Sequence, residues 1–268
     1  MNDGPRVLTW LLDWLAGGGS LLLLSDYDGT LTPIVDRPDQ AWLADATRDD
    51  LQTLARSPRI HVAFVSGRDL ADLRARVGVT DAIYAGCHGL EIEGPGLHFC
   101  HPDAEAQQHT LDFIGRQLSR QAPTVPGMRV ECKRFGLAVH YRHVQRDQVR
   151  RVETELARAI QLGGGRLKVF HGTEVIEIQP QVGWNKGDCV LWIRDVIQRA
   201  SSAPVMVLYL GDDWTDEHAF ETLAGQGITI RVGSEVPASR AGYRLPDVAG
   251  VQRLLSALAT QTGRGDAG

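Results

Sequence analysis

Short apolar runs that end in polar or glycine-rich turns recur in the first and last parts of the chain. The four clearest runs span residues 21–25, 60–65, 82–85 and 205–210. Helical patterns surround them at about 41–56, 69–76, 186–200, 215–224 and 247–260. Continuous apolar strands are typical of sheets that are buried on both faces. Their alternation with helices predicts parallel βαβ units, and therefore an α/β protein.

The middle of the chain follows a different pattern, in which apolar and polar residues alternate along the strands. Strands are predicted at 128–133, 137–142, 167–170 and 174–179, with helices at 103–121 and 146–161. This α-β-β-α-β-β order predicts a small antiparallel sheet with helices on one face. We therefore expect a core formed by residues 1–102 and 181–268, and an inserted α+β domain at 103–180.

The length of 268 residues is sufficient for a core domain and a smaller one. A formal net charge of −5 gives no support for binding to nucleic acid or to a membrane surface. Asp13 interrupts the apolar residues between Trp10 and Leu15, which indicates an amphipathic helix rather than a signal peptide. No apolar stretch approaches the ~20 residues of a membrane helix. The four cysteines form no CxxC pair, so we expect reduced thiols and a cytoplasmic protein.

Two carboxylates stand one residue apart where the first apolar run ends, in Ser25-Asp26-Tyr27-Asp28-Gly29-Thr30. In an open α/β sheet, ligands bind at the carboxyl ends of the strands. Carboxylate and carbonyl oxygens suit Mg²⁺, and Asp26 is a candidate nucleophile that would form an aspartyl phosphate. The alternative is a simple helix N-cap after a strand. The four leucines before Ser25 and the Gly-Thr-Leu after Asp28 favour the functional interpretation.

Two further segments suit the binding of a phosphoryl group. Ser66-Gly67-Arg68 follows the second strand, where a hydroxyl and exposed N–H groups form an anion site, although a serine N-cap explains this pattern equally well. Lys186 opens a predicted helix and can neutralise charge on Asp26 and on a phosphoryl group. The chain has only three lysines, and a cation at a helix N-terminus opposes the macrodipole. Both facts argue against a purely solvated role for Lys186.

An acidic loop follows the fourth apolar run, in Gly211-Asp212-Asp213-Trp214-Thr215-Asp216-Glu217. Capping of the next helix does not need so many carboxylates, and they repel one another without a cation nearby. We therefore expect this loop to complete a Mg²⁺ site together with Asp26 and Asp28.

In this order, the four segments resemble the haloacid dehalogenase (HAD) superfamily of phosphohydrolases. That family uses a nucleophilic Asp, a second Asp two residues later, a Ser or Thr, a Lys, and an acidic loop for Mg²⁺. The resemblance implies a Rossmann-like parallel-sheet core with an inserted α+β cap domain that selects the substrate. The predicted insertion lies between Ser66 and Lys186, where the family has its larger cap.

A narrower resemblance is to the trehalose-6-phosphate phosphatase family. In the core it is carried by residues 26–34, 65–68, 86–91 and 211–217, and in the insertion by residues 130–133, 140–142 and 175–178. These segments are distributed through nearly the whole chain. The implied substrate is a small-molecule sugar phosphate, with a functional link to a trehalose-phosphate synthase.

By that resemblance Asp26 is the nucleophile, and Asp28 protonates the leaving sugar oxygen and then activates water. Ser66 and Lys186 hold the phosphoryl oxygens. Mg²⁺ is bound by the Asp26 carboxylate, the Asp28 backbone carbonyl and Asp212, with Asp213 close by. The implied substrate-binding residues are Gly67, Arg68, Glu131, Lys133, Arg142 and Glu177.

The residues of the insertion also have their own physical logic. Glu131 and Lys133 alternate on a strand and share a face, which suits either a polyhydroxylated ligand or solvent. The sequence departs from the family pattern at Gly172-Thr173-Glu174, which lacks a lysine, and at Gln179, which replaces a base. Two other functions stay open: hydrolysis of another sugar phosphate, such as sucrose phosphate or a glycosylglycerate phosphate, and non-catalytic binding of a phosphosugar. The complete set of core residues argues against the second.

Overall fold

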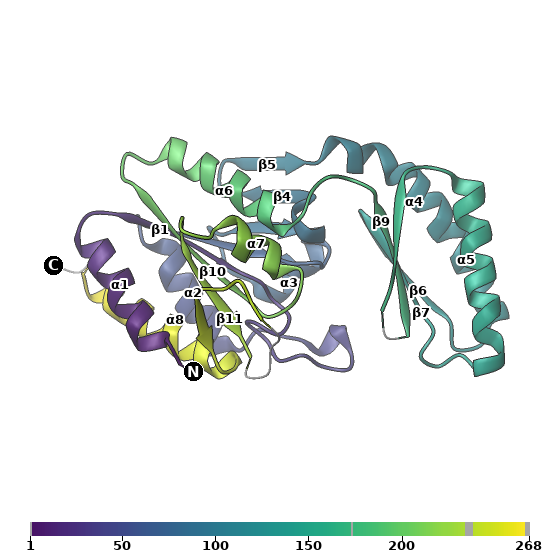
Figure 1. Cartoon of the computed structure of the whole chain (residues 1–268), viewed down its shortest axis with the longest axis horizontal. Helices are drawn as coiled ribbons and strands as arrows, with labels where there is room; N and C mark the ends of the chain where they lie inside the picture. Colours follow the sequence, from purple (N-terminus) through teal and green to yellow (C-terminus); the bar gives the residue numbers. More distant parts are fainter. Residues whose placement is uncertain (1, 173, 234–237, 266–268) are drawn as a thin grey trace. The chain divides into compact units, whose positions relative to one another are not determined.

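The computed structural model describes residues 2–172, 174–233 and 238–265 (Figure 1). The chain forms two compact units, Met1–Phe99 with Trp184–Gly268, and Cys100–Gly183. The expected insertion at 103–180 lies inside the second unit. Thr173, one of the positions where the sequence departs from the family pattern, lies outside the described residues.

Unit 1 contains a sheet of eight strands in the order β12-β11-β10-β1-β2-β3-β4-β5. The strands are β1 (Ser20–Ser25), β2 (Ile60–Val65), β3 (Ile83–Gly86), β4 (Glu91–Gly94), β5 (Leu97–Cys100), β10 (Val205–Gly211), β11 (Ile228–Val232) and β12 (Tyr243–Leu245). All pairs from β12 to β3 are parallel, and β4 is antiparallel to β3. The four predicted core strands and the α/β class are confirmed. Strands β4, β5, β11 and β12 extend the sheet beyond the prediction.

Helices cover both faces of this sheet (Figure 1). They are α1 (Gly4–Ala16), α2 (Asp45–Arg56), α3 (Leu70–Val77), α6 (Lys186–Ala200), α7 (Asp216–Thr222) and α8 (Val248–Gly265). The helix expected from about residue 41 begins only at Asp45, so its predicted start is wrong. Ala41 and Leu43 are buried whereas Trp42 is exposed, and this two-residue period is that of an extended segment.

The leucines of β1 explain why this strand lies at the centre of the fold. Leu21 and Leu23 belong to one apolar cluster, which includes side chains of α1, α2 and α8. Leu22 and Leu24 belong to another, which includes side chains of α6 and α7. Successive side chains of a strand point to opposite faces, and because helices cover both faces, all four leucines are 0% exposed. The carboxyl end of β1 is thereby held between β10 and β2.

Two aromatic rings of unit 1 mark the points where the chain leaves and re-enters it. Phe99 is its last residue before the insertion, and Trp184 is the first after it. Their rings are stacked with centroids 5.1 Å apart, and Trp192 lies 4.9 Å from Phe99. The exit and the re-entry of the chain are therefore held side by side.

Unit 2 has the α-β-β-α-β-β order that the sequence predicts. Its elements are α4 (Pro102–Gln121), β6 (Arg129–Lys133), β7 (Gly136–His140), α5 (Val149–Gly163), β8 (Leu167–His171) and β9 (Val175–Pro180). The strands form an antiparallel sheet in the order β6-β7-β9-β8. A separate apolar core joins this sheet to α4 and α5.

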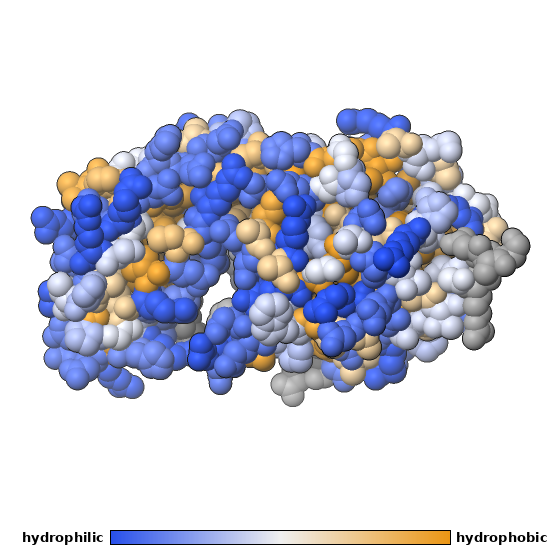
Figure 2. Space-filling model, turned by 180° about the vertical axis from the view of Figure 1, so that it is seen from behind, coloured by the Kyte–Doolittle hydropathy of each residue, from blue (hydrophilic) through white to orange (hydrophobic). Residues whose placement is uncertain are grey.

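The surface visible in Figure 2 is mainly hydrophilic, with apolar residues in separate small groups. Across residues 2–172, 174–233 and 238–265, the helices are all too short or too polar to cross a membrane.

Candidate active site

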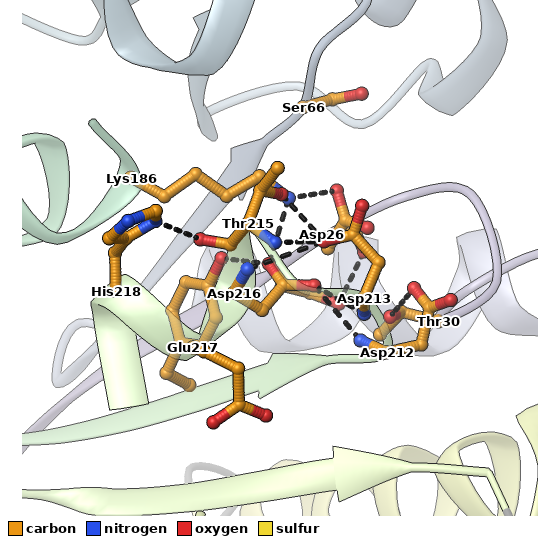
Figure 3. A network of polar contacts seen from close by, with 12 residues as sticks. Asp26, Thr30, Ser66, Lys186, Asp212, Asp213, Thr215, Asp216, Glu217 and His218 are labelled. Carbon is orange, nitrogen blue, oxygen red and sulfur yellow. Dashed lines mark hydrogen bonds and ion pairs between the residues drawn. The ribbon is translucent and has the colours of Figure 1, made fainter. Parts of the chain in front are cut away.

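Asp26 lies directly after β1, and its backbone N–H donates to the carbonyl of Leu210 on β10 at 2.9 Å. Its side chain is almost fully buried, and Oδ1 lies 3.0 Å from Nζ of Lys186 (Figure 3). Lys186 is the first residue of α6. Its position is set by a capping box, in which Asn185 accepts from the N–H of Gly187 and donates its own N–H to Asp188. The strand end and the helix start are thus brought together by ordinary backbone rules.

Asp216 is the third member of this buried group and is 0% exposed. Its Oδ1 accepts from Lys186 at 2.8 Å and from the hydroxyl of Tyr209 at 2.7 Å. Its Oδ2 accepts from the backbone N–H groups of Asp212 and Asp213, both at 3.0 Å. Asp216 therefore ties the acidic loop to Lys186. The sequence placed Asp216 in the acidic cluster but gave it no separate role, and the buried Tyr209 was not singled out at all.

Asp212 faces the loop that follows β1. Thr30 donates its hydroxyl to Asp212 Oδ1 at 3.0 Å. Gly29 has φ +82°, and a Cβ at this position would lie 2.1 Å from Asp212 Oδ2. Only glycine leaves room for this approach.

Asp213 has its Oδ1 engaged locally, because it accepts from the N–H and the hydroxyl of Thr215 at 2.8 and 2.6 Å. Burial alone would raise the pKa of Asp213, but Lys186 and these hydrogen bonds hold it below the usual value. Among the residues that the structure describes, the carboxylates of Asp26, Asp212 and Asp216 form a group whose oxygens lie within 4.8 Å of one another. The Asp213 carboxylate does not belong to that group, and Asp28 is expected to contribute a backbone carbonyl instead.

The electrostatics of this group suit a divalent cation. Burial, together with the neighbouring carboxylates Asp216 and Asp212, raises the pKa of Asp26 well above its usual value, although Lys186 opposes this. Burial and Asp216 raise the pKa of Asp212 to about 6. Burial would lower the pKa of Lys186, but Asp26 and Asp216 outweigh it and the pKa is raised. One ammonium among three carboxylates leaves an excess of negative charge on hard oxygen ligands.

Ser66, Gly67 and Arg68 form the turn after β2. Ser66 is buried, and its Oγ accepts from the backbone N–H of Arg68 at 3.2 Å. In Figure 3, Ser66 lies apart from the network drawn with dashed lines. A Cβ at Gly67 would lie 2.8 Å from the ring of His88, so the backbone and this ring are closely packed. The guanidinium of Arg68 binds both carboxylate oxygens of Asp28, each at 2.7 Å.

Some of the expected sugar-binding residues of unit 2 lie close to one another. Strand register aligns Glu131, Ala138, Glu177 and Phe170 across the four strands. Lys133, two residues after Glu131, shares its face and lies 4.0 Å from Glu177.

Two further contacts involve residues at the end of β7. His140 lies 2.9 Å from Glu131. Arg142, just after β7, donates to Glu174 at 3.0 Å in an exposed pair.

Comparisons with known proteins place the chain in a family. A model of the family described as "Trehalose-phosphatase" matches residues 24–248. The trehalose-phosphate phosphatase of Mycobacterium tuberculosis is 45% identical over 210 residues, covering 77% of this chain and 52% of the relative. That of Mycobacterium avium is 40% identical over 276 residues, covering 99% of this chain and 68% of the relative. The chain spans about half the length of the first of these relatives.

Solved structures agree on the fold. The crystal structure of a trehalose-6-phosphate phosphatase related protein matches with a TM-score of 0.76 and 22% identity, covering 91% of this chain and 99% of that one. At this identity the likeness concerns the fold alone, which is the Rossmann-like α/β architecture of haloacid dehalogenase-like hydrolases. The family match runs through both units, and the chain belongs to the trehalose-phosphatase family.

Proposed function

We propose that this chain hydrolyses trehalose 6-phosphate to trehalose and phosphate through an aspartyl-phosphate intermediate. The observation that carries the proposal is the buried contact of Asp26 with Lys186 beside the Asp212 and Asp216 carboxylates, in a member of this family. A carboxylate held against an ammonium at the end of the central strand is suited to attack phosphorus.

The reaction has two halves. In the first, Asp26 attacks phosphorus, the bond from phosphorus to the sugar oxygen breaks, and Asp28 gives its proton to that oxygen. In the second, Asp28 takes a proton from water, whose oxygen attacks phosphorus, and phosphate leaves as the Asp26 carboxylate is restored. Splitting the hydrolysis in this way replaces one difficult step with two easier ones.

Lys186 and Ser66 hold the phosphoryl oxygens, and the N–H groups of the turn at Gly67 support them. Both side chains are buried, so a charge that develops there interacts strongly with them. The pairing of Lys186 with Asp216 fixes the ammonium before substrate arrives, and no reorganisation is needed during the reaction.

Mg²⁺ would be held at this site by the Asp26 and Asp212 carboxylates and the Asp28 carbonyl, with Asp213 nearby. When bound, Mg²⁺ supplies positive charge that neutralises phosphate oxygens. Asp216 is better suited to position the loop than to bind the metal. Each of its oxygens already accepts two hydrogen bonds.

The sugar is recognised in unit 2 by Glu131, Lys133, Arg142 and Glu177. Carboxylates accept from sugar hydroxyls, while Lys and Arg donate to them. Another sugar phosphate is the alternative, because these contacts alone decide which sugar fits.

The four cysteines are free thiols, which supports a reducing cytoplasmic setting for the protein. The functional partner in this proposal is a trehalose-phosphate synthase.

The test is the release of phosphate from trehalose 6-phosphate with and without Mg²⁺, alongside sucrose phosphate and a glycosylglycerate phosphate. We expect Mg²⁺-dependent release, with the highest kcat/KM for trehalose 6-phosphate. The Asp26→Asn variant should lose activity while its circular dichroism is unchanged. A ranking with trehalose 6-phosphate near the bottom would reject the substrate, and near-normal turnover of Asp26→Asn would reject the nucleophile.

A further inference from the structure

Arg68 and Asp28 form an ion pair with two hydrogen bonds near the proposed active site. Arg68 donates from Nε to Asp28 Oδ2 and from Nη2 to Asp28 Oδ1, both at 2.7 Å. This is the two-point geometry in which a guanidinium recognises a carboxylate most specifically. The Arg68 side chain is 10% exposed, whereas that of Asp28 is 41% exposed. Arg68 is therefore the fixed partner of the pair.

Arg68 is fixed because a second carboxylate holds its third nitrogen. Nη1 of Arg68 donates to Asp72 at 2.7 Å, and Asp72 also accepts from Arg76, four residues later on α3. Arg76 in turn donates to the backbone carbonyls of Asp39 and Ala41. The charges alternate in sign along this row, and its far end is anchored to the backbone.

The surroundings of Arg68 support the same conclusion. The ring of Tyr27 lies 5.4 Å from the guanidinium carbon, so that one face of the group rests on an aromatic side chain. Burial would lower the pKa of Arg68, but the hydrogen bonds that it donates to Asp28 and Asp72 raise the pKa above its ordinary value. The guanidinium stays charged throughout the working pH range.

We infer that Arg68 is a positioning residue that holds the Asp28 carboxylate ready to accept a proton from water, and is not a ligand of the substrate phosphate. The inference rests on the proposed function, in which Asp28 is the acid and then the base. The edge of Arg68 that carries Nε and Nη2 is committed to Asp28, and Nη1 to Asp72. Binding a phosphate through this fork would require the release of one of these carboxylates.

The pairing also separates the two halves of the reaction. When Asp28 carries the proton for the leaving sugar oxygen, the protonated oxygen is a weaker acceptor for Arg68, so one of the two bonds is weakened. After the proton has gone to the sugar, both oxygens can return to Arg68. Asp28 then takes a proton from the water that attacks phosphorus, as the bond from phosphorus to Asp26 breaks. Arg68 therefore holds both Asp28 oxygens at the start of the second half, when the carboxylate must take a proton from water.

The experiment uses p-nitrophenyl phosphate, whose leaving group departs without a proton, so the first half does not depend on Asp28. For Arg68→Gln we expect a rapid release of one p-nitrophenol per protein, followed by turnover slowed by roughly 10²-fold relative to the wild type. Phosphoryl-enzyme, trapped by acid quench, should accumulate. Arg68→Lys keeps the charge but not the two-point geometry, so its turnover rate should lie between those of the wild type and Arg68→Gln.

A double-mutant cycle with Asp28→Asn shows whether Arg68 acts through Asp28. If it does, Arg68→Gln adds little to the slow turnover of Asp28→Asn. Additive losses, or a raised KM without accumulation of phosphoryl-enzyme, would overturn the inference and make Arg68 a phosphate ligand. Asp72→Asn, which does not touch Asp28, should show a weaker form of the Arg68→Gln behaviour.

Two controls separate this test from the proposed function. Arg74→Gln removes a half-exposed arginine on the same helix, paired with Glu93, and should behave as the wild type. Asp26→Asn should give no burst. A wild type that cleaves p-nitrophenyl phosphate but not trehalose 6-phosphate would refute only the proposed substrate. The test of Arg68 would remain valid, because it uses p-nitrophenyl phosphate. A wild type that cleaves neither compound would refute both.

Discussion

Lys186 donates to Asp216 at 2.8 Å, a contact between the first residues of α6 and α7, which are 30 residues apart in the chain. Both side chains are at most 2% exposed. A buried ammonium needs a charged partner that is always present, and Asp216 provides it whether or not a phosphate is bound. Asp26 is thereby left free to change its bonding during the reaction.

Replacement of Asp216 by Asn tests this arrangement. The amide offers one acceptor where the carboxylate offers two, so either the Lys186 and Tyr209 donors or the loop N–H groups lose their partner. We expect the free energy of unfolding to fall by about 3 kcal/mol and turnover to fall strongly. Urea unfolding and phosphate release measure the two effects. Asp195→Asn, which alters a half-buried pair with Arg194, is the matched control and should change neither.

Tyr209→Phe removes a single donor from the same carboxylate. Burial and the nearby Asp216 raise the pKa of Tyr209 well above its usual value, so the phenol is a neutral donor at every working pH. Asp216 Oδ1 keeps Lys186 after the change, and we expect a loss of about 1 kcal/mol in stability. A loss as large as that of Asp216→Asn would show that Lys186 does not support the carboxylate alone.

Metal binding should depend on pH through Asp212. Its pKa of about 6 in the folded protein exceeds the ordinary value of 3.8, so between these values the metal-free native state binds more protons than the unfolded chain. Its stability therefore falls as pH rises through this window. Mg²⁺ requires the ionised carboxylate, so added Mg²⁺ should raise the melting temperature well above pH 6 and have little effect well below it. Equal stabilisation at both pH values would contradict a role for Asp212 in metal binding.

In unit 2, the 2.9 Å contact between His140 and Glu131 should set the orientation of the carboxylate. For His140→Phe we expect the KM for trehalose 6-phosphate to rise by roughly tenfold, as for one lost hydrogen bond. Hydrolysis of p-nitrophenyl phosphate, which has no sugar, should be unaffected. His143→Gln, in the exposed loop after β7, serves as the control. Similar losses on both substrates would indicate a structural defect instead.

Much of the fold was predictable because the local pattern of apolar and polar residues indicates which faces of each element are buried. The leucines of β1 are apolar without interruption because helices cover both of their faces. The alternation around β6 and β9 likewise marks a sheet with one face on a core. The segment at Ala41–Ala44 misled the prediction because its period of two was too short to outweigh the helical pattern that follows.

The site was predictable only in part, for a different reason. The positions of Asp26, Lys186 and Asp212 were predictable because these residues lie at strand ends and at a helix start, which are local features of the sequence. The roles of Asp216 and Arg68 depend on which distant residue each one contacts. Asp216 accepts hydrogen bonds from Tyr209 and Lys186, and Arg68 donates to Asp28, 40 residues away in the chain. Local sequence patterns do not predict such long-range contacts.

The stacked rings of Phe99 and Trp184 have a consequence for how such proteins diversify. They hold together the two points at which residues 100–183 join the rest of the chain. Because both junctions lie on one aromatic pair, the intervening segment can be exchanged as a single piece without cutting any of the parallel strands from β12 to β3. A lineage could therefore acquire a new sugar preference by replacing one continuous piece of the gene, while the hydrolytic machinery is inherited unchanged.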